Sequence, residues 1–337
     1  MKRGGTWLAA ALFPQALLLA QVEGTLINGT TGRPQGGASV TLMNLGGAGM
    51  EPVGNTKSDA EGRFRFERKV EGPHLLQAAH DSITYSRMLR PGEPATGLKL
   101  EVFDASPKPR GTKVTTHMIL LEPGASELSV NESVIYRNDG KLTWNNEAEG
   151  TLRLWLPAEA GGIVRVLASA PQGMPLDRPA RETKEKGVRK VDFPVKPGET
   201  RFDISYAVPF QSPGTFAGRV LQTDMPARIV APPGVTLKGD GIQFLGQEPA
   251  TQASIYEVSG REYKITVEGS GSLREAAGQA EEEGGAGLQQ IRPRLYDRLY
   301  VIVGLALLIL LLGLAMLYRK QAAAAPPPGP ESKARRR

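Results

Sequence analysis

The chain has no cysteine, only three histidines and 6% aromatic residues. Without cysteine, a disulfide framework, a thiolate metal site and a thiol nucleophile are all excluded. Three histidines also leave few nitrogen ligands for a catalytic zinc ion. The 337 residues are otherwise ordinary, with 40% hydrophobic and 23% charged side chains, a composition that excludes a chain disordered throughout.

The net charge of +6 lies at the two ends. Lys2 and Arg3 stand near the start, and residues 319–337 hold six basic side chains against one acidic side chain. Between these ends, acidic and basic residues nearly balance. A folded part without a net field has no electrostatic attraction for a polyanion, so we predict no nucleic-acid partner.

The first 20 residues have the pattern of a secretory signal peptide. The basic pair is followed by an apolar run from Trp7 to Leu19 and by Ala20 before the polar Gln21. We expect cleavage after Ala20. The alternative is an uncleaved anchor, but Pro14 interrupts the run and leaves it too short to span a bilayer.

A second apolar run, residues 299–318, carries no charge and would form a helix about 30 Å long. Tyr300 and Tyr318 mark its ends, and Arg319 and Lys320 follow at once. We predict a single transmembrane helix with the N-terminal domains outside the cytoplasm. Residues 319–337 would then form a basic cytoplasmic tail, and the Gly- and Glu-rich residues 269–298 a flexible stalk.

Residues 21–90 alternate apolar and polar side chains with the period of two that is typical of half-buried strands. Val40 and Leu42 show it in one run, and Phe64 and Phe66 in another. Turn residues separate these runs. The pattern predicts an antiparallel β-sandwich.

Four segments of this region, residues 22–26, 31–34, 38–42 and 58–64, resemble the carboxypeptidase regulatory-like domain in order and spacing. The resemblance implies a prealbumin-like or carbohydrate-binding-like sandwich over residues 21–90. Such domains are accessory modules and not catalysts. Residues 44–50 depart from the pattern of that domain as an insertion that would lengthen one loop.

Further strand patterns fill residues 91–208, where Leu98, Leu100 and Val102 alternate with polar residues. Their number predicts an immunoglobulin-like or fibronectin-like sandwich. Residues 209–268 would form either a small third β domain or the completion of the second. The predicted fold class is therefore all-β: tandem antiparallel β-sandwiches with one C-terminal transmembrane helix.

No sequence motif points to a reaction. The serine hydrolase, P-loop, dinucleotide, HExxH and EF-hand signatures are all absent from the sequence. None of His74, His80 and His117 has a carboxylate three residues later, as a zinc carboxypeptidase site requires. We therefore predict no catalytic, cofactor-binding or metal-binding residues, and no enzyme.

The predicted function is that of a non-catalytic, single-pass protein of a bacterial cell envelope whose β-sandwich modules bind another protein. The alternative is a module that binds a glycan or peptidoglycan. For that alternative, Trp144 and Trp155 are the candidate stacking residues, because an indole face packs on a sugar ring. Burial of either tryptophan in a sandwich core is the competing interpretation.

Overall fold

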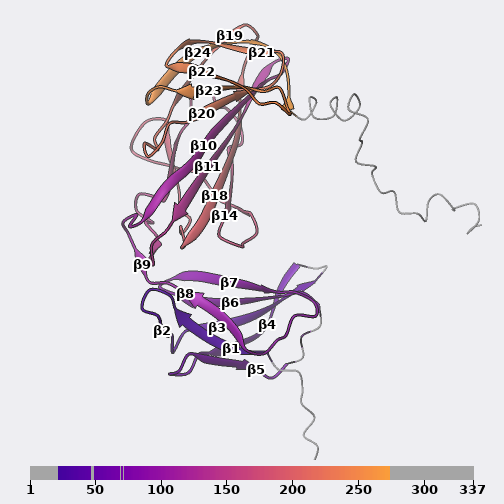
Figure 1. Cartoon of the computed structure of the whole chain (residues 1–337), viewed down its shortest axis with the longest axis vertical. Helices are drawn as coiled ribbons and strands as arrows, with labels where there is room; N and C mark the ends of the chain where they lie inside the picture. Colours follow the sequence, from indigo (N-terminus) through magenta and orange to yellow (C-terminus); the bar gives the residue numbers. More distant parts are fainter. Residues whose placement is uncertain (1–21, 47–48, 69, 71, 274–337) are drawn as a thin grey trace, which may run out of the picture. The chain divides into compact units, whose positions relative to one another are not determined.

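The computed structural model describes residues 22–46, 49–68, 70 and 72–273. Within these residues, no helix has the length and hydropathy needed to cross a bilayer. The expected signal peptide (1–20), transmembrane helix (299–318), cytoplasmic tail (319–337) and almost all of the stalk (269–298) lie outside the described residues. Every element named in the described part is a strand, so this part is all-β as predicted (Figure 1).

Two four-stranded sheets form the first sandwich, which we define as residues 22–104. One sheet contains β1 (Val22–Asn28), β2 (Arg33–Pro34), β5 (Arg63–Phe66) and β8 (Leu98–Val102). The other contains β3 (Ser39–Gly46), β4 (Gly49–Lys57), β6 (His74–His80) and β7 (Ile83–Leu89). Their apolar faces share one core, to which Leu26, Leu42 and Leu76 contribute fully buried side chains.

Strand β8 belongs to this first sandwich, although the sequence analysis groups residues 98–102 with the second. It pairs in parallel with β1, matching Gly24 to Leu98 and Asn28 to Val102. Its side chains Leu98, Leu100 and Val102 are buried in the first core. The first sandwich therefore extends past residue 90, to the end of β8.

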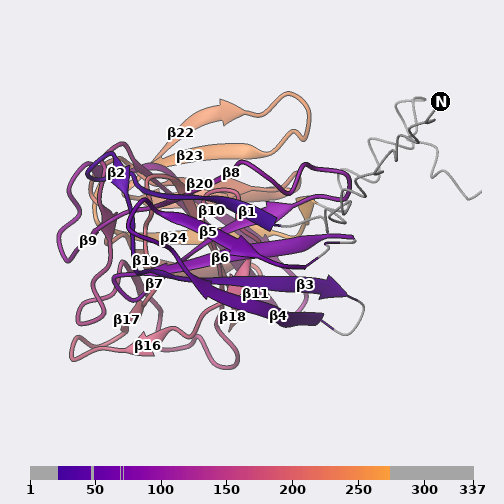
Figure 2. The ribbon, with the colours of Figure 1, turned by 90° about the horizontal axis from the view of Figure 1, so that it is seen from below.

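The second body, residues 105–273, is built on one eight-stranded sheet. In spatial order its strands are β15 (Leu176–Asp177), β14 (Arg165–Ser169), β18 (Gly198–Pro209), β11 (Glu127–Asn138), β10 (Thr112–Pro123), β20 (Arg228–Ala231), β23 (Ser254–Val258) and β22 (Ile242–Gln247). In Figure 2, β22 is drawn beside β23, its neighbour in the sheet.

Two three-stranded sheets pack on this large sheet. The first contains β13 (Leu152–Trp155), β16 (Arg181–Glu182) and β17 (Val188–Val191). The second contains β19 (Gly214–Arg219), β21 (Val235–Asp240) and β24 (Glu262–Gly269). A short parallel pair, β9 (Ala105–Ser106) and β12 (Thr143–Trp144), completes the described strands.

Each covering sheet encloses its own hydrophobic core, but both cores use the long strands β10, β11 and β18. Leu128 and Val130 belong to one core, while Val134 and Tyr136 of the same strand belong to the other. Residues 209–268 supply β20, β22 and β23 to the large sheet and the whole second covering sheet. Of the two possibilities left by the sequence, they complete the second body.

A buried polar pair stands on the face that carries both cores. His117 on β10 is 1% exposed, and its Nε2 lies 2.6 Å from Oε1 of Glu132 on β11. The Nδ1 atom of His117 has no hydrogen-bond partner in the described residues. Tyr206 packs against both cores.

Candidate functional site

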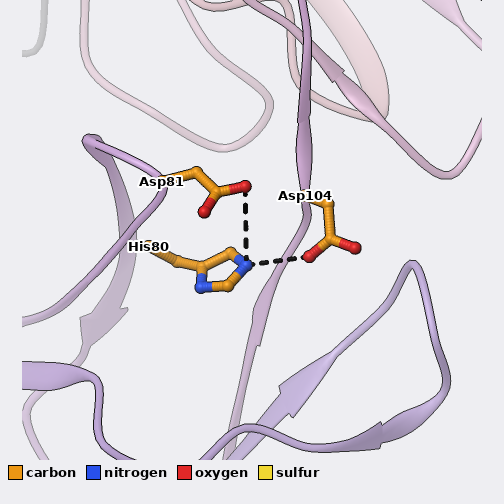
Figure 3. A group of neighbouring side chains, drawn as sticks. All are labelled: His80, Asp81 and Asp104. Atoms are coloured by element: carbon orange, nitrogen blue, oxygen red, sulfur yellow. Dashed lines mark hydrogen bonds and ion pairs between the residues drawn. The ribbon is translucent and has the colours of Figure 1, made fainter.

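A histidine and two aspartates converge at one end of the first sandwich (Figure 3). His80 is the last residue of β6, and Asp81 begins the two-residue turn into β7. Asp81 and Ser82 both have positive φ, as a tight hairpin turn requires. Asp104 follows β8 and comes from the opposite sheet. The fold thus joins residues 24 positions apart in the sequence.

The three side chains meet at the Nε2 atom of His80. This atom lies 2.9 Å from Oδ1 of Asp104 and 3.9 Å from Oδ2 of Asp81. The His80 side chain is 14% exposed, whereas those of Asp104 and Asp81 are 36% and 47% exposed. The cluster is therefore held on its protein side and open to solvent on the carboxylate side.

Neighbouring groups fix both carboxylates. Asn28 Nδ2 donates a hydrogen bond of 2.7 Å to Asp104 Oδ1, and the backbone N–H of Ala105 donates one of 3.0 Å to Asp81 Oδ2. The hydrogen bonds from His80 and Asn28 lower the pKa of the Asp104 carboxyl, which keeps it ionised at neutral pH. The arrangement offers one imidazole nitrogen and two carboxylate oxygens, a donor set able to hold a cation.

Sequence reasoning missed this cluster because it looked for a carboxylate at a fixed distance after each histidine. Asp104 reaches His80 only through the closure of the two sheets, and nothing local predicts that contact. His74 lies at the other end of β6, with Nδ1 3.2 Å from the carbonyl oxygen of Gly72. His117 lies in the second body, so the three histidines do not form one site.

Trp144, one of the two candidate stacking residues, is part of a packed aromatic group. Its ring lies 5.8 Å from that of Tyr136 in an edge-on geometry, and its Nε1 donates a hydrogen bond to the carbonyl oxygen of Pro107. The indole is half-buried against the core. These contacts leave Trp144 with a structural role.

Trp155, the other candidate, lines a hollow of about 720 Å³ on the outer face of the second covering sheet. Its ring is half-buried, and the hollow also presents Arg219, Asp240 and Lys264. Glu185 accepts hydrogen bonds of 2.8 Å from both Arg153 and Arg219, which ties the two covering sheets together beside this hollow. The two tryptophans thus have different surroundings, since Trp155 adjoins an open polar hollow and Trp144 packs in an aromatic group.

A third candidate is strand β22, which forms one edge of the large sheet. It pairs only with β23 in the described residues, and a bulge lies between Phe244 and Gly246. Phe244 is 56% exposed and Leu245 is 47% exposed. Residues 241–247 contain no charged side chain, while Asp240 and Glu248 flank them. The edge therefore offers free backbone groups beside apolar side chains.

Two other edge strands of the described residues, β15 and β4, lack this combination. Strand β15, at the opposite edge of the large sheet, has only two residues and ends in Asp177. Strand β4, an edge of the first sandwich, contains Pro52 and ends in Lys57. Short length, charge and proline are the usual means by which proteins prevent pairing at sheet edges. Of the features that prevent edge pairing, strand β22 has only its bulge.

Comparison with known proteins assigns no family. No family model matches the chain, and no curated protein matches it. Among solved structures, an M1 zinc metallopeptidase from Deinococcus radiodurans is similar over 46% of this chain and 42% of that chain, with 16% identity and a TM-score of 0.23. A mutant of that enzyme bound to a Tyr-Ser-Ala substrate is similar over 47% and 43%, also with 16% identity and a TM-score of 0.23.

The matched part therefore spans less than half the length of these structures. TM-scores this low assign neither a fold nor an activity to the chain. The resemblance of residues 21–90 to the carboxypeptidase regulatory-like domain stays a prediction.

Proposed function

We propose that this protein is a non-catalytic, single-pass membrane protein of the bacterial envelope whose β-sandwich modules bind another protein. In this proposal, residues 21–90 lie within a prealbumin-like module and the second body is an immunoglobulin-like or fibronectin-like variant. The signal-peptide pattern of residues 1–20 and the apolar run at 299–318 support a chain that is exported and anchored by one membrane span.

The observation that carries the proposal is the exposed edge strand β22. An edge strand with unpaired backbone groups is a template for an extended segment of another chain, which adds to the sheet as a further strand. Phe244 and Leu245 are adjacent at the bulge, and both are exposed, so they offer apolar contacts beside the free edge. The partner we propose is an extended, apolar peptide segment.

Site-specific crosslinking in the native envelope tests this proposal. A photoreactive residue at Gln243, exposed on β22, should give a discrete protein adduct that mass spectrometry identifies. The same residue at Lys57, exposed on the edge strand β4, is the matched control and should give none. Equal adducts at both positions, or none at Gln243, would contradict the proposal.

A second variant separates strand addition from chance proximity. Leu245→Lys places a charge at the edge and leaves the contact between the Phe244 and Tyr256 rings, whose centres are 5.4 Å apart. We expect this change to abolish the Gln243 adduct because a charged edge disfavours pairing. Unchanged crosslinking in this variant would remove β22 as the docking edge.

The hollow beside Trp155 supports the alternative, a glycan-binding module. A half-buried indole next to charged and hydroxyl side chains is the composition that orients a sugar ring. In a Trp144→Phe variant, Trp155 is the one tryptophan left in the chain after the predicted signal cleavage. Titration with soluble polysaccharides and peptidoglycan fragments should then change its fluorescence, and a flat response to all of them would exclude this alternative.

A further inference from the structure

We propose that His80, Asp81 and Asp104 form a binding site for a divalent transition-metal ion, with Zn²⁺ as the ion that fits best. This site is separate from strand β22 and from the hollow beside Trp155, so it does not depend on either proposed function. The metal would have a structural role, joining the two sheets of the first sandwich at one end.

The first argument is geometric. One donor atom from each residue lies within 4.8 Å of the other two. Zinc binds histidine nitrogen and carboxylate oxygen at about 2.0 to 2.2 Å, which places two ligands of a tetrahedral site roughly 3.4 Å apart. The observed separations of 2.9 Å and 3.9 Å from His80 Nε2 lie on either side of that value. Shifts of about half an ångström would bring both aspartate oxygens to that distance from His80 Nε2.

The second argument is charge. Asp81 and Asp104 form ion pairs only with His80 among the described residues. A single histidine supplies at most one positive charge to two carboxylates, and none when it is neutral. A divalent cation would balance both carboxylates and would bind a neutral imidazole.

The third argument is the support of the ligands. Asn28 Nδ2 donates a hydrogen bond to Asp104, and the Ala105 N–H donates one to Asp81. The backbone N–H of Asp104 also donates a 2.9 Å hydrogen bond to Thr30 Oγ1. Metal ligands are commonly oriented by such outer hydrogen bonds. Both carboxylates are therefore held in place before any ion binds.

The mixed donor set selects the type of ion. Ca²⁺ and Mg²⁺ prefer sites made of oxygen atoms, whereas imidazole nitrogen favours Zn²⁺ and its neighbours. Three protein ligands leave a fourth position, which water would fill. Because Asp81 is half-exposed, the ion can exchange with solvent.

Isothermal titration of the full chain with ZnCl₂ tests the proposal. We expect one Zn²⁺ per chain, no comparable heat with CaCl₂, and a higher unfolding midpoint when Zn²⁺ is present. In Co²⁺-loaded protein, visible absorption bands of tetrahedral Co²⁺ should appear. Absence of stoichiometric Zn²⁺ binding would overturn the proposal and show that the cluster is only a hydrogen-bond network.

Variants then locate the bound ion. His80→Ala and Asp104→Asn should abolish Zn²⁺ binding, and Asn28→Ala should weaken it about tenfold through the lost outer hydrogen bond. His74→Ala, on the same strand, is the matched control and should bind as tightly as the original chain. If His80→Ala fails to fold, Asp81→Asn serves in its place, because Asp81 is on the surface and asparagine retains an acceptor for the Ala105 N–H. Zn²⁺ binding that persists in these variants would place the ion elsewhere and refute the assignment.

Discussion

At the scale of single residues, Gly218 shows how closely the second covering sheet is packed. It is a buried residue of β19, directly opposite Tyr263 of β24. A Cβ atom added at Gly218 would lie 2.2 Å from the Tyr263 hydroxyl oxygen. The Tyr263 ring is buried and has little room to withdraw. The absence of a side chain at position 218 is therefore a packing requirement.

Gly218→Ala should accordingly lower the free energy of unfolding by about 1 to 3 kcal/mol, the usual loss for overpacking a core. Urea unfolding followed by tyrosine fluorescence measures this loss. Gly260→Ala is the control, since a Cβ atom at Gly260 would meet nothing within 4 Å. Equal stability of the two variants would mean that Tyr263 moves aside without loss.

At the scale of elements, the pair His117–Glu132 links strands β10 and β11 beneath the covering sheets. Both side chains point into the protein, and the Nδ1 atom of His117 has no partner in the described residues. The contact with Glu132 is therefore the hydrogen bond that satisfies a ring nitrogen of this buried histidine.

His117→Leu should destabilise the protein by roughly 3 kcal/mol because it leaves the Glu132 carboxylate buried without its partner. The double variant His117→Leu with Glu132→Leu should regain most of this loss, since two apolar side chains need no partner there. Urea unfolding of both single variants and the double variant forms a complete cycle. Losses that simply add in the double variant would show that the two side chains are not coupled.

The strands themselves were largely predictable, because alternation is a local property. Leu152, Leu154 and Leu156 are buried while Trp155 between them is half-buried, as the period of two predicts. Pairing partners were not predictable in the same way. Strand β8 pairs with β1, which lies far from it in the sequence, and the packing of the two sheets then brings Asp104 to His80. The candidate metal site follows from that pairing, so no local pattern reveals it.

Strand β22 is a case in which the strand was predictable but its place in the sheet was not. The sequence predicts β structure for residues 209–268, which include this strand. Its position at the edge of an eight-stranded sheet depends on the order of the strands, which the sequence pattern does not determine. Two adjacent apolar residues predict a buried strand by pattern alone, and only the topology shows that Phe244 and Leu245 are exposed.

At the scale of the whole molecule, the shared strands β10, β11 and β18 make the second body cooperative. Each contributes side chains to both cores, so neither core can lose its covering sheet without exposing part of the same strands. We expect one unfolding transition for this body. Tyr136 and Tyr263 are buried in these cores, and the partly buried Tyr206 packs against both.

These tyrosines predict how stability depends on alkaline pH. Burial raises the pKa of the Tyr136, Tyr206 and Tyr263 hydroxyls above the usual value of 10.0, and it raises the pKa of Tyr85 in the first sandwich to about 12. Below pH 10 these tyrosines stay protonated in both the folded and the unfolded chain, so their contribution to the free energy of unfolding is fully present. Above pH 10 the unfolded chain releases them first, and the free energy of unfolding must fall.

Urea unfolding at a series of pH values, with tyrosinate absorbance recorded in parallel, checks this dependence. Tyrosinate should form together with unfolding, and Tyr263→Phe should make the loss of stability less steep. Ionisation of all tyrosines near pH 10 in a chain that remains folded would contradict the burial described above.

The parallel pairing of β1 with β8 also sets an order of events during synthesis. When β1 leaves the ribosome, its parallel partner β8 has not yet been made, and the sheet stays incomplete until residues 98–102 emerge. In a newly made chain that ends before residue 98, Val22 and Leu26 lack the core side chains that β8 supplies. Folding of the first sandwich is therefore a late event relative to the appearance of its first strand.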